Sequence, residues 1–328
     1  MPKPTKTSFS NNENASLPLV IVNPKSAAGA TSSRWTEIAS DFRTHFGAFQ
    51  VAFTKGHGDG ILLAKRAVES GRKFIIACGG DGTINEIANG ILESGAEDVE
   101  LGILPSGTGG DFRRTIGMPT EIREVARTLR EGKTRQIDAG RVTFQDFTGE
   151  TVSRYFLNIS SFGLSASIIE NVKSTTLLNW LPNNIVRGKA SFALSTLQEF
   201  LSLDFKTVRV KIDDRQEKQL NTINFCICNS RFFGGGMKIA PDAKINDGLL
   251  DVVNIGDIKT AKILLNAYSL YRGTHLNLPE VKSTVARKVE VSPINNEEIH
   301  IEIDGELLGK LPAFYEIVPN ALKIRVPK

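Results

Sequence analysis

Residues 74–88 most constrain the fold, because they combine an apolar run, three closely spaced glycines and an amphipathic segment. The apolar run, Phe74 to Cys78, is typical of a buried β-strand. The glycines that follow permit positive φ and leave room for a ligand to approach the main chain. A helix is predicted next, since apolar residues recur at the i, i+3, i+4 and i+7 spacing of one helix face. These residues are Ile84, Ile87, Ala88 and Ile91.

A helix N-terminus reached through a glycine turn is a natural site for a phosphate group. Asp81 is the acid inside this turn, and beside phosphates its carboxylate is suited to holding Mg²⁺ or orienting a nucleophile. Thr83 and Glu86 have the T-x-x-E spacing of a capping box, which predicts that the helix begins there. The alternative is a tight strand-to-helix connection without a ligand. The acid, the capping box and two further loops of the same kind argue against that alternative.

Strands and helices alternate throughout the first half of the chain, which predicts a Rossmann-like α/β domain with a parallel sheet over residues 17–138. In such sheets ligands bind beyond the carboxyl ends of the strands. The loops that follow the predicted strands should therefore lie along one edge of the sheet. They begin at Asn23, Thr54, Gly79 and Gly107. Neither the G-x-x-x-x-G-K-[ST] pattern nor the dinucleotide pattern G-x-G-x-x-G is present.

The pattern changes after about residue 138, where short strands separated by turn signals predict an antiparallel β-sandwich domain over residues 139–328. The strand candidates are 154–160, 205–212, 223–228, 250–253, 285–291, 299–303 and 315–318. Three helical stretches interrupt them, at 164–173, 190–201 and 261–271. The last strand, 322–326, could close either domain. Residues 1–16 are polar and are expected to form a disordered tail.

Two turns in the second half carry acids. In the turn from Pro241 to Asp251, the Asp247 carboxylate, nearby carbonyls and water could hold a hard cation. An Asn-Asp-Gly hairpin turn explains the same residues equally well. In the second turn, Asp304-Gly305-Glu306, a carboxylate at a domain edge could serve as a general base, although a simple Asp-Gly hairpin is the alternative.

The four histidines have no metal-like spacing to one another, and no role is predicted for them. They are His45, His57, His275 and His300.

Composition limits the classes of partner. The net charge of +4 is too mild to indicate nucleic-acid binding, although it fits transient contact with anionic lipid. No apolar run approaches the roughly 18 residues that span a membrane, and no secretion signal is recognisable. Three cysteines, two of them in C-x-C spacing, do not suggest a disulfide framework, so a cytoplasmic location is expected. The apolar stretch 177–182 could contact lipid, but packing within the domain is favoured.

Five motifs occur in order along the chain. They are Asn23-Pro24-Lys25-Ser26, Gly79-Gly80-Asp81-Gly82-Thr83, Leu104-Pro105-Ser106-Gly107-Thr108 with Asp111, Pro241 to Asp251, and Asp304-Gly305-Glu306. Together they resemble the diacylglycerol kinase catalytic-domain family, which includes bacterial lipid kinases and sphingosine and ceramide kinases. The resemblance covers roughly residues 18–328. The glycine-rich motif alone is shared with NAD kinases and related phosphofructokinases, whereas the five together are specific.

The resemblance implies an ATP-dependent kinase acting on a lipid hydroxyl, with ATP and Mg²⁺ in a cleft between the two domains. Glu306 matches the family's proton acceptor, and Asp81 and Asp111 match acids of the nucleotide and catalytic metal site. Asp247, with the backbone carbonyls of Lys244 and Leu249, matches a structural Mg²⁺ site. Residues expected to contact ATP are Asn23, Lys25, Thr54, Gly79, Gly80, Asp81, Gly82, Thr83, Ile84, Asn85, Gly107 and Thr108.

One position departs from the family pattern, because Gly110 stands where the commoner family loop has Asn. A role of that Asn side chain in the family is therefore not carried over to this chain. The expected role of the neighbouring Asp111 is less affected, because its carboxylate is retained. The expected partner is a lipid substrate at a membrane surface, with peripheral contact at the inner face. A homodimer is compatible with the sequence, which specifies neither the oligomeric state nor the lipid. Two alternatives remain open: an NAD kinase-like enzyme, and a non-catalytic lipid-binding regulatory protein.

Overall fold

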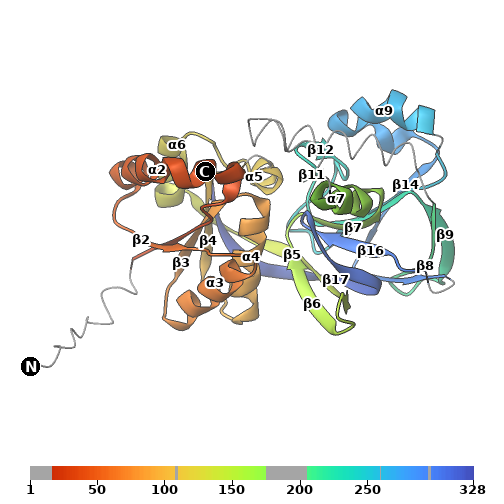
Figure 1. Ribbon diagram of the computed structural model, residues 1–328, viewed down its shortest axis with the longest axis horizontal. Helices are drawn as coiled ribbons and strands as arrows, with labels where there is room; N and C mark the ends of the chain where they lie inside the picture. Colours follow the sequence, from red (N-terminus) through yellow and green to blue (C-terminus); the bar gives the residue numbers. More distant parts are fainter. Residues whose placement is uncertain (1–16, 108–109, 175–204, 259, 295–296) are drawn as a thin grey trace, which may run out of the picture.

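The computed structural model describes residues 17–107, 110–174, 205–258, 260–294 and 297–328 and has two lobes (Figure 1). The first lobe contains helices on a parallel sheet, and the second is mainly antiparallel β-structure. This arrangement confirms the predicted fold class. The predicted helix 190–201 and the apolar stretch 177–182 lie outside the described residues.

The first lobe has four parallel strands in the order β2-β1-β3-β4. Helices α2 and α6 pack together, and α3 and α4 pack together on the other face of the sheet (Figure 1). The buried side chains of the strands form one core with those of the helices. The elements are β1 (Leu19–Val22), η1 (Ser26–Gly29), α2 (Ala30–Phe46), β2 (Gln50–Phe53), α3 (Asp59–Glu69), β3 (Phe74–Gly79), α4 (Asp81–Glu93), β4 (Glu100–Pro105), α5 (Asp111–Ile116) and α6 (Ile122–Glu131).

Two long strands are shared by both lobes. β17 (Glu306–Val326) starts in the second lobe and ends beside β4, where Ile324 pairs with Leu101 in parallel. β5 (Lys133–Asp146) runs antiparallel along almost the whole of β17. The final segment 322–326 therefore returns to the first sheet, and position 138 falls inside a continuous strand. The site between the lobes is consequently built on one hydrogen-bonded sheet.

The second lobe is a sandwich of two antiparallel layers. One layer has the order β14-β13-β10-β7-β16, and the other has β9-β8-β15-β17-β5-β6. Side chains from both layers share one core, in which Phe162 stacks on Phe225 at 5.2 Å between ring centroids. Its elements are β6 (Thr151–Phe156), β7 (Ile159–Gly163), α7 (Leu164–Ser174), β8 (Lys206–Ile212), β9 (Lys218–Thr222), β10 (Asn224–Cys228), β11 (Phe232–Phe233), β12 (Met237–Lys238), β13 (Leu250–Ile255), α9 (Thr260–Arg272), η2 (His275–Asn277), β14 (Val281–Ala286), β15 (Lys288–Pro293) and β16 (His300–Ile303).

Two predicted strands are each divided in the structure. The run 154–160 forms the end of β6 and the start of β7, and the run 285–291 forms parts of β14 and β15. The first break has a clear cause, because the N–H groups of Leu157 and Asn158 both donate to the Asp304 carboxylate rather than to a strand. All three cysteines are buried and free. No helix among the described residues is long and apolar enough to cross a membrane.

Candidate active site

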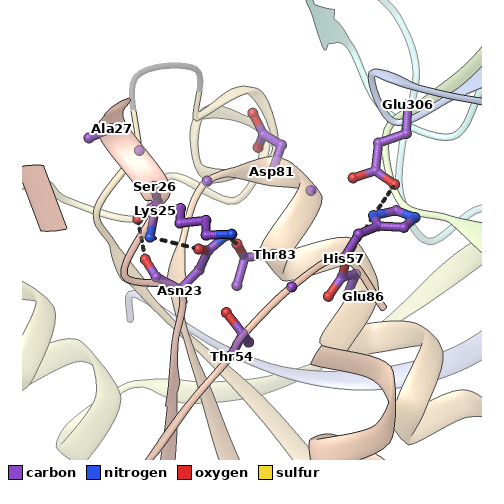
Figure 2. A pocket seen from close by; sticks show the side chains of 14 residues that line it. Asn23, Lys25, Ser26, Ala27, Thr54, His57, Asp81, Thr83, Glu86 and Glu306 are labelled. Carbon is purple, nitrogen blue, oxygen red and sulfur yellow. Dashed lines mark hydrogen bonds and ion pairs between the residues drawn. The ribbon is translucent and has the colours of Figure 1, made fainter. Parts of the chain in front are cut away.

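A cavity of about 400 Å³ lies where the loops of the first lobe face the start of β17. Its wall contains residues from the loops after β1, β2, β3 and β4, so the four loops do meet at one edge of the sheet. Glu306 of the second lobe faces them across the cavity (Figure 2). The lining residues are Asn23, Lys25, Ser26, Ala27, Thr54, Gly56, His57, Gly80, Asp81, Gly82, Thr83, Glu86, Gly107 and Glu306.

Two glycines are required by the close approach of neighbouring loops. A Cβ atom on Gly107 would lie 2.5 Å from the Cα of Gly80, which is closer than real Cβ contacts allow. The same loop is tied to β3, because the Ser106 N–H donates to the Gly79 carbonyl at 3.1 Å. A Cβ on Gly79 would meet the Thr83 hydroxyl at 2.5 Å. The main chain therefore forms this wall, as a phosphate-binding surface requires.

The predicted capping box is wrong. Helix α4 begins at Asp81, and its N-cap is Gly80, three residues before the N-cap Thr83 that the capping box predicts, without a side-chain cap. The Thr83 hydroxyl instead accepts a hydrogen bond from Asn23 Nδ2 at 3.0 Å. Glu86 accepts from the N–H groups of Gly58 and Gly60, at 2.8 and 2.9 Å, and so caps α3 rather than its own helix. Both side chains join α4 to neighbouring loops of the site.

The two predicted metal-site acids have different surroundings. The Asp81 carboxylate lines the cavity and accepts from the backbone N–H groups of Asp111 (3.0 Å) and Phe112 (3.1 Å), at the start of α5. Asp111 is buried and does not line the cavity. Its carboxylate instead accepts hydrogen bonds from Arg114 (2.9 Å) and from the Gly235 N–H (2.8 Å). Burial raises the pKa of Asp111 and the nearby Asp81 adds to the rise, whereas Gly235 and Arg114 oppose it. Of the two, Asp81 fits a group that faces a cation, whereas Asp111 already has a cationic partner.

Three predicted ATP contacts lie elsewhere. Asn85 Nδ2 donates to the Tyr155 carbonyl (2.9 Å) and to Asp304 (2.7 Å), so its side chain joins the two lobes. Gly79 and the buried Ile84 line a second hollow of about 350 Å³, which shares Ala27, Gly80 and Gly107 with the first cavity. That hollow also contains the basic side chains Arg34, Arg113 and Arg114. Thr108 lies outside the described residues.

The turn that carries Glu306 is held by two buried carboxylates. Asp304, with φ +47°, accepts from the N–H groups of Leu157, Asn158 and Ile159, each at 2.9 Å. Glu302 accepts from the Gly305 N–H at 2.9 Å and from the Ser161 hydroxyl. Burial raises the pKa of Asp304 to about 6 and that of Glu302 to about 7, although these hydrogen bonds oppose the shifts. The backbone of Glu306 is therefore fixed while its side chain faces the cavity.

Comparison with known proteins agrees with this arrangement. The diacylglycerol kinase catalytic domain model matches residues 18–142, and the model of the YegS C-terminal NAD kinase beta sandwich-like domain matches residues 160–326. The chain belongs to the diacylglycerol kinase catalytic-domain family. The two matched spans of this family include both walls of the cavity, because Glu306 falls in the second span and the other lining residues fall in the first.

Relatives in the family have similar lengths. The diacylglycerol kinase of Bacillus subtilis (strain 168) is 29% identical over 310 residues, covering 94% of this chain and 96% of its own. That of Mycobacterium tuberculosis (strain H37Rv) is 29% identical over 267 residues, covering 81% of each chain. A crystal structure of a diacylglycerol kinase from Bacillus anthracis str. Sterne has the same fold, with a TM-score of 0.67 and 22% identity over 94% of this chain and 96% of that one.

His57 is a site residue that the sequence analysis missed. It lines the cavity, and its Nδ1 lies 3.3 Å from Glu86 Oε1 and 3.6 Å from Glu306 Oε2 (Figure 2). The histidines have no metal-like spacing to one another in the sequence, because the neighbours of His57 are two glutamates from distant parts of the chain. Its place in the loop after β2, one of the loops predicted to meet at the sheet edge, is the signal that could have found it.

The predicted structural Mg²⁺ site occupies a separate region. Asp247 is exposed and lines a hollow that shares no lining residue with the Glu306 cavity. Its carboxylate accepts from the Leu249 N–H at 3.1 Å, and the Gly248 N–H donates to Asp138 at 2.8 Å. Burial raises the pKa of nearby Asp251 to about 6, and the negative charges of Asp247 and Asp242 add to the rise. This concentration of acids fits a hard cation, whereas the internal hydrogen bond also fits the alternative of a simple turn. The roles of Asp247 and of the Lys244 and Leu249 carbonyls stay predictions.

Proposed function

We propose that this protein is an ATP- and Mg²⁺-dependent lipid kinase that transfers the γ-phosphoryl group to a hydroxyl of diacylglycerol or a related lipid alcohol. The observation that carries the proposal is the cavity in which the N-terminus of α4 faces Glu306 of the other lobe. Phosphoryl transfer requires mainly positioning and charge compensation, and this cavity contains groups for both. The relatives named diacylglycerol kinase support the substrate class.

The first lobe supplies groups suited to ATP phosphates. The first backbone N–H groups of a helix lack intrahelical partners, and the helix dipole adds positive potential there. In α4 these groups belong to Asp81, Gly82 and Thr83, all of which line the cavity. Lys25 lines the same wall and adds a positive charge. Asp81 would hold Mg²⁺, which when bound neutralises charge on the phosphates.

Glu306 is suited to the role of general base. Its side chain is 32% exposed, so an incoming hydroxyl can reach it, and Asp304 and Glu302 fix the turn beneath it. As the lipid oxygen forms its bond to the γ-phosphorus, the bond to the β,γ-bridging oxygen breaks and Glu306 takes the hydroxyl proton. A positioned general base typically contributes a factor of about 10² to 10⁴ to the rate.

We further propose that the lipid is reached by transient peripheral contact with the inner face of a membrane, which the net charge of +4 favours where the lipid is anionic. A second candidate is an NAD kinase-like activity, because the matched C-terminal model describes an NAD kinase beta sandwich-like domain. The glycine-rich turn alone does not separate the two activities.

The test is incubation of the protein with labelled ATP and Mg²⁺, in parallel with a whole-lipid extract and with NAD. Mass spectrometry then identifies the phosphorylated product. We expect a phosphorylated lipid alcohol from the wild-type protein and at least about a hundredfold less of it from Glu306→Gln in the same time. Phosphorylated NAD without a lipid product would favour the second candidate. ATP binding without any transfer would favour a non-catalytic regulatory role.

A further inference from the structure

His57, Glu86 and Glu306 place three ligand-type atoms together, although they come from the loop after β2, from helix α4 and from the start of β17. Among the described residues, they are the only set of three or more His, Cys, Asp or Glu side chains whose ligand atoms all lie within 4.8 Å of one another. Figure 2 shows the imidazole pointing between the two carboxylates. The same ring nitrogen, Nδ1, faces both of them, at 3.3 and 3.6 Å.

The separations from His57 Nδ1 are close to the spacing of ligands around one small metal ion. Bonds of about 2.1 Å at angles between octahedral and tetrahedral place neighbouring ligand atoms about 3.0 to 3.4 Å apart. The Glu86 oxygen, at 3.3 Å from Nδ1, already has that spacing, and the Glu306 oxygen is slightly farther away at 3.6 Å. The two carboxylate oxygens lie within 4.8 Å of each other, so rotation of the Glu306 side chain toward Glu86 would complete the set.

The supporting contacts keep two of the ligands in place without a metal. Glu86 is only 12% exposed and receives hydrogen bonds from Gly58 and Gly60, one on each carboxylate oxygen. Carboxylate ligands are commonly oriented by hydrogen bonds of this kind. The Glu306 turn is held by Asp304 and Glu302, as described above. His57 is 66% exposed, which leaves an open side through which an ion can enter.

The donor set indicates which class of ion fits. One imidazole nitrogen with two carboxylate oxygens suits zinc, cobalt and manganese dications, whereas Mg²⁺ prefers oxygen ligands alone. The site is therefore chemically distinct from the position at Asp81, which offers only oxygen. The three thiols cannot compete for such an ion, because Cys78, Cys226 and Cys228 are all buried.

We propose that His57, Glu86 and Glu306 form a binding site for a transition-metal dication such as Zn²⁺. A metal ion there binds the carboxylate that the proposed function requires as a base, so occupancy blocks phosphoryl transfer to the lipid. This regulatory consequence rests on the proposed function, whereas the binding site itself does not. Metal binding is consequently measured first, without ATP or lipid.

The binding experiment is calorimetric titration of the ATP-free protein with zinc chloride in excess Mg²⁺, with visible absorption of bound Co²⁺ as a second readout. We expect one high-affinity site per chain. His57→Ala and Glu306→Gln should each weaken binding by about tenfold or more, since each removes one of three ligands. Glu86 is left unchanged, because its replacement would also remove the cap of α3.

His300 provides a matched control. It also lies between two glutamates, but Nδ1 faces Glu170 at 3.2 Å and Nε2 faces Glu298 at 3.0 Å. The two ring nitrogens point in different directions, so one ion cannot take both carboxylates together with one nitrogen. His300→Ala should therefore bind zinc as tightly as the wild-type protein.

The proposal is overturned if the wild-type protein binds no zinc in excess Mg²⁺, or if His57→Ala binds it with wild-type affinity. In the activity arm, zinc should inhibit lipid phosphorylation by the wild-type protein and His300→Ala at the concentration that fills the site. His57→Ala should require at least about tenfold more zinc for the same inhibition. A protein that binds zinc as expected but phosphorylates no lipid would refute the proposed function and leave the site standing.

Discussion

Asn85 Nδ2 lies 2.7 Å from Asp304 Oδ2, and this hydrogen bond joins the helix of the glycine turn to the turn that carries Glu306. Asp304 is buried and also accepts from three backbone N–H groups at the start of β7. The distance across the cavity, from the α4 N-terminus to Glu306, therefore depends on a contact outside the cavity.

Replacing Asn85 by Ala should reduce stability and turnover rather than ATP affinity. The change removes a donor to a buried carboxylate, which typically costs about 1–3 kcal/mol of unfolding free energy. We expect kcat to fall while KM for ATP changes by less than about twofold, because Asn85 does not line the cavity. Urea denaturation and steady-state kinetics measure both quantities. A large rise in KM for ATP with unchanged stability would instead support the predicted ATP contact.

Asp81 and Asp111 should respond differently to loss of charge. Asp81→Asn removes a carboxylate from the cavity wall, so more Mg²⁺ should be needed for half-maximal activity. Asp111→Asn removes the partner of Arg114 outside the cavity and should lower the unfolding free energy by about 1–3 kcal/mol without changing the Mg²⁺ requirement.

The measurement is activity against Mg²⁺ concentration at saturating ATP for both variants, together with denaturant unfolding. An equal shift in Mg²⁺ requirement for the two variants would show that Asp111 ligates the ion, as the family resemblance implies.

The residues whose environment depends on the strand pattern were predictable from the sequence. The carboxyl ends of parallel strands share one edge of the sheet, so the strand pattern alone predicts that the loops at Asn23, Thr54, Gly79 and Gly107 lie close together. The cavity lining confirms this prediction. The motifs that resemble the family also identified Glu306 as a candidate site residue, and Glu306 lines the cavity.

The residues whose role depends on a distant partner were not predictable. Thr83 and Glu86 fit a local capping box, yet each binds a segment 26 or more residues away in sequence. Asn85 and His57 have partners in the second lobe, more than 200 residues later. The strand pattern could have placed His57 at the sheet edge, but it gives no signal for the pairing of His57 with Glu306 or of Asn85 with Asp304, because local spacing does not say which distant part of the chain will approach.

Glu302 should make stability depend on pH. Its folded-state pKa is raised to about 7 by burial, with the charge of Asp304 adding to the rise, whereas the unfolded value is about 4.5. The folded state thus holds more protons between these values, and the stabilisation that Glu302 provides below pH 4.5 is lost as pH rises through 7. Tyr315 and Cys226 also lie close enough to feel its charge, but both have raised pKa values and stay neutral in this range.

Glu302→Gln removes this titration, so the fall in unfolding free energy between pH 4.5 and 7.5 should be smaller by about 1–3 kcal/mol. A smaller slope remains, because the raised pKa of Asp304 acts in the same direction. Denaturant unfolding across this range measures the effect. Glu290→Gln, which alters an exposed ion pair with Lys211, serves as the control and should keep the wild-type slope. A wild-type slope in Glu302→Gln would mean that Glu302 is ionised throughout.

Glu306→Gln tests the base directly, because the amide keeps the shape of the side chain and cannot accept the hydroxyl proton. We expect kcat to fall by about 10² to 10⁴, with ATP affinity within about threefold of wild type. Stopped-flow single turnovers and equilibrium ATP binding separate these effects.

Glu298→Gln is the matched control, since Glu298 is a 57% exposed neighbour of β16 that pairs with His300 and Lys310 and does not line the cavity. If both variants turn over at the wild-type rate, the proton leaves by another route, and the cavity positions substrates without a protein base. If only Glu306→Gln is slow, Glu306 is the base. The hydrogen bonds that fix the turn before β17 then have a function, because they keep the Glu306 carboxylate within reach of the attacking hydroxyl.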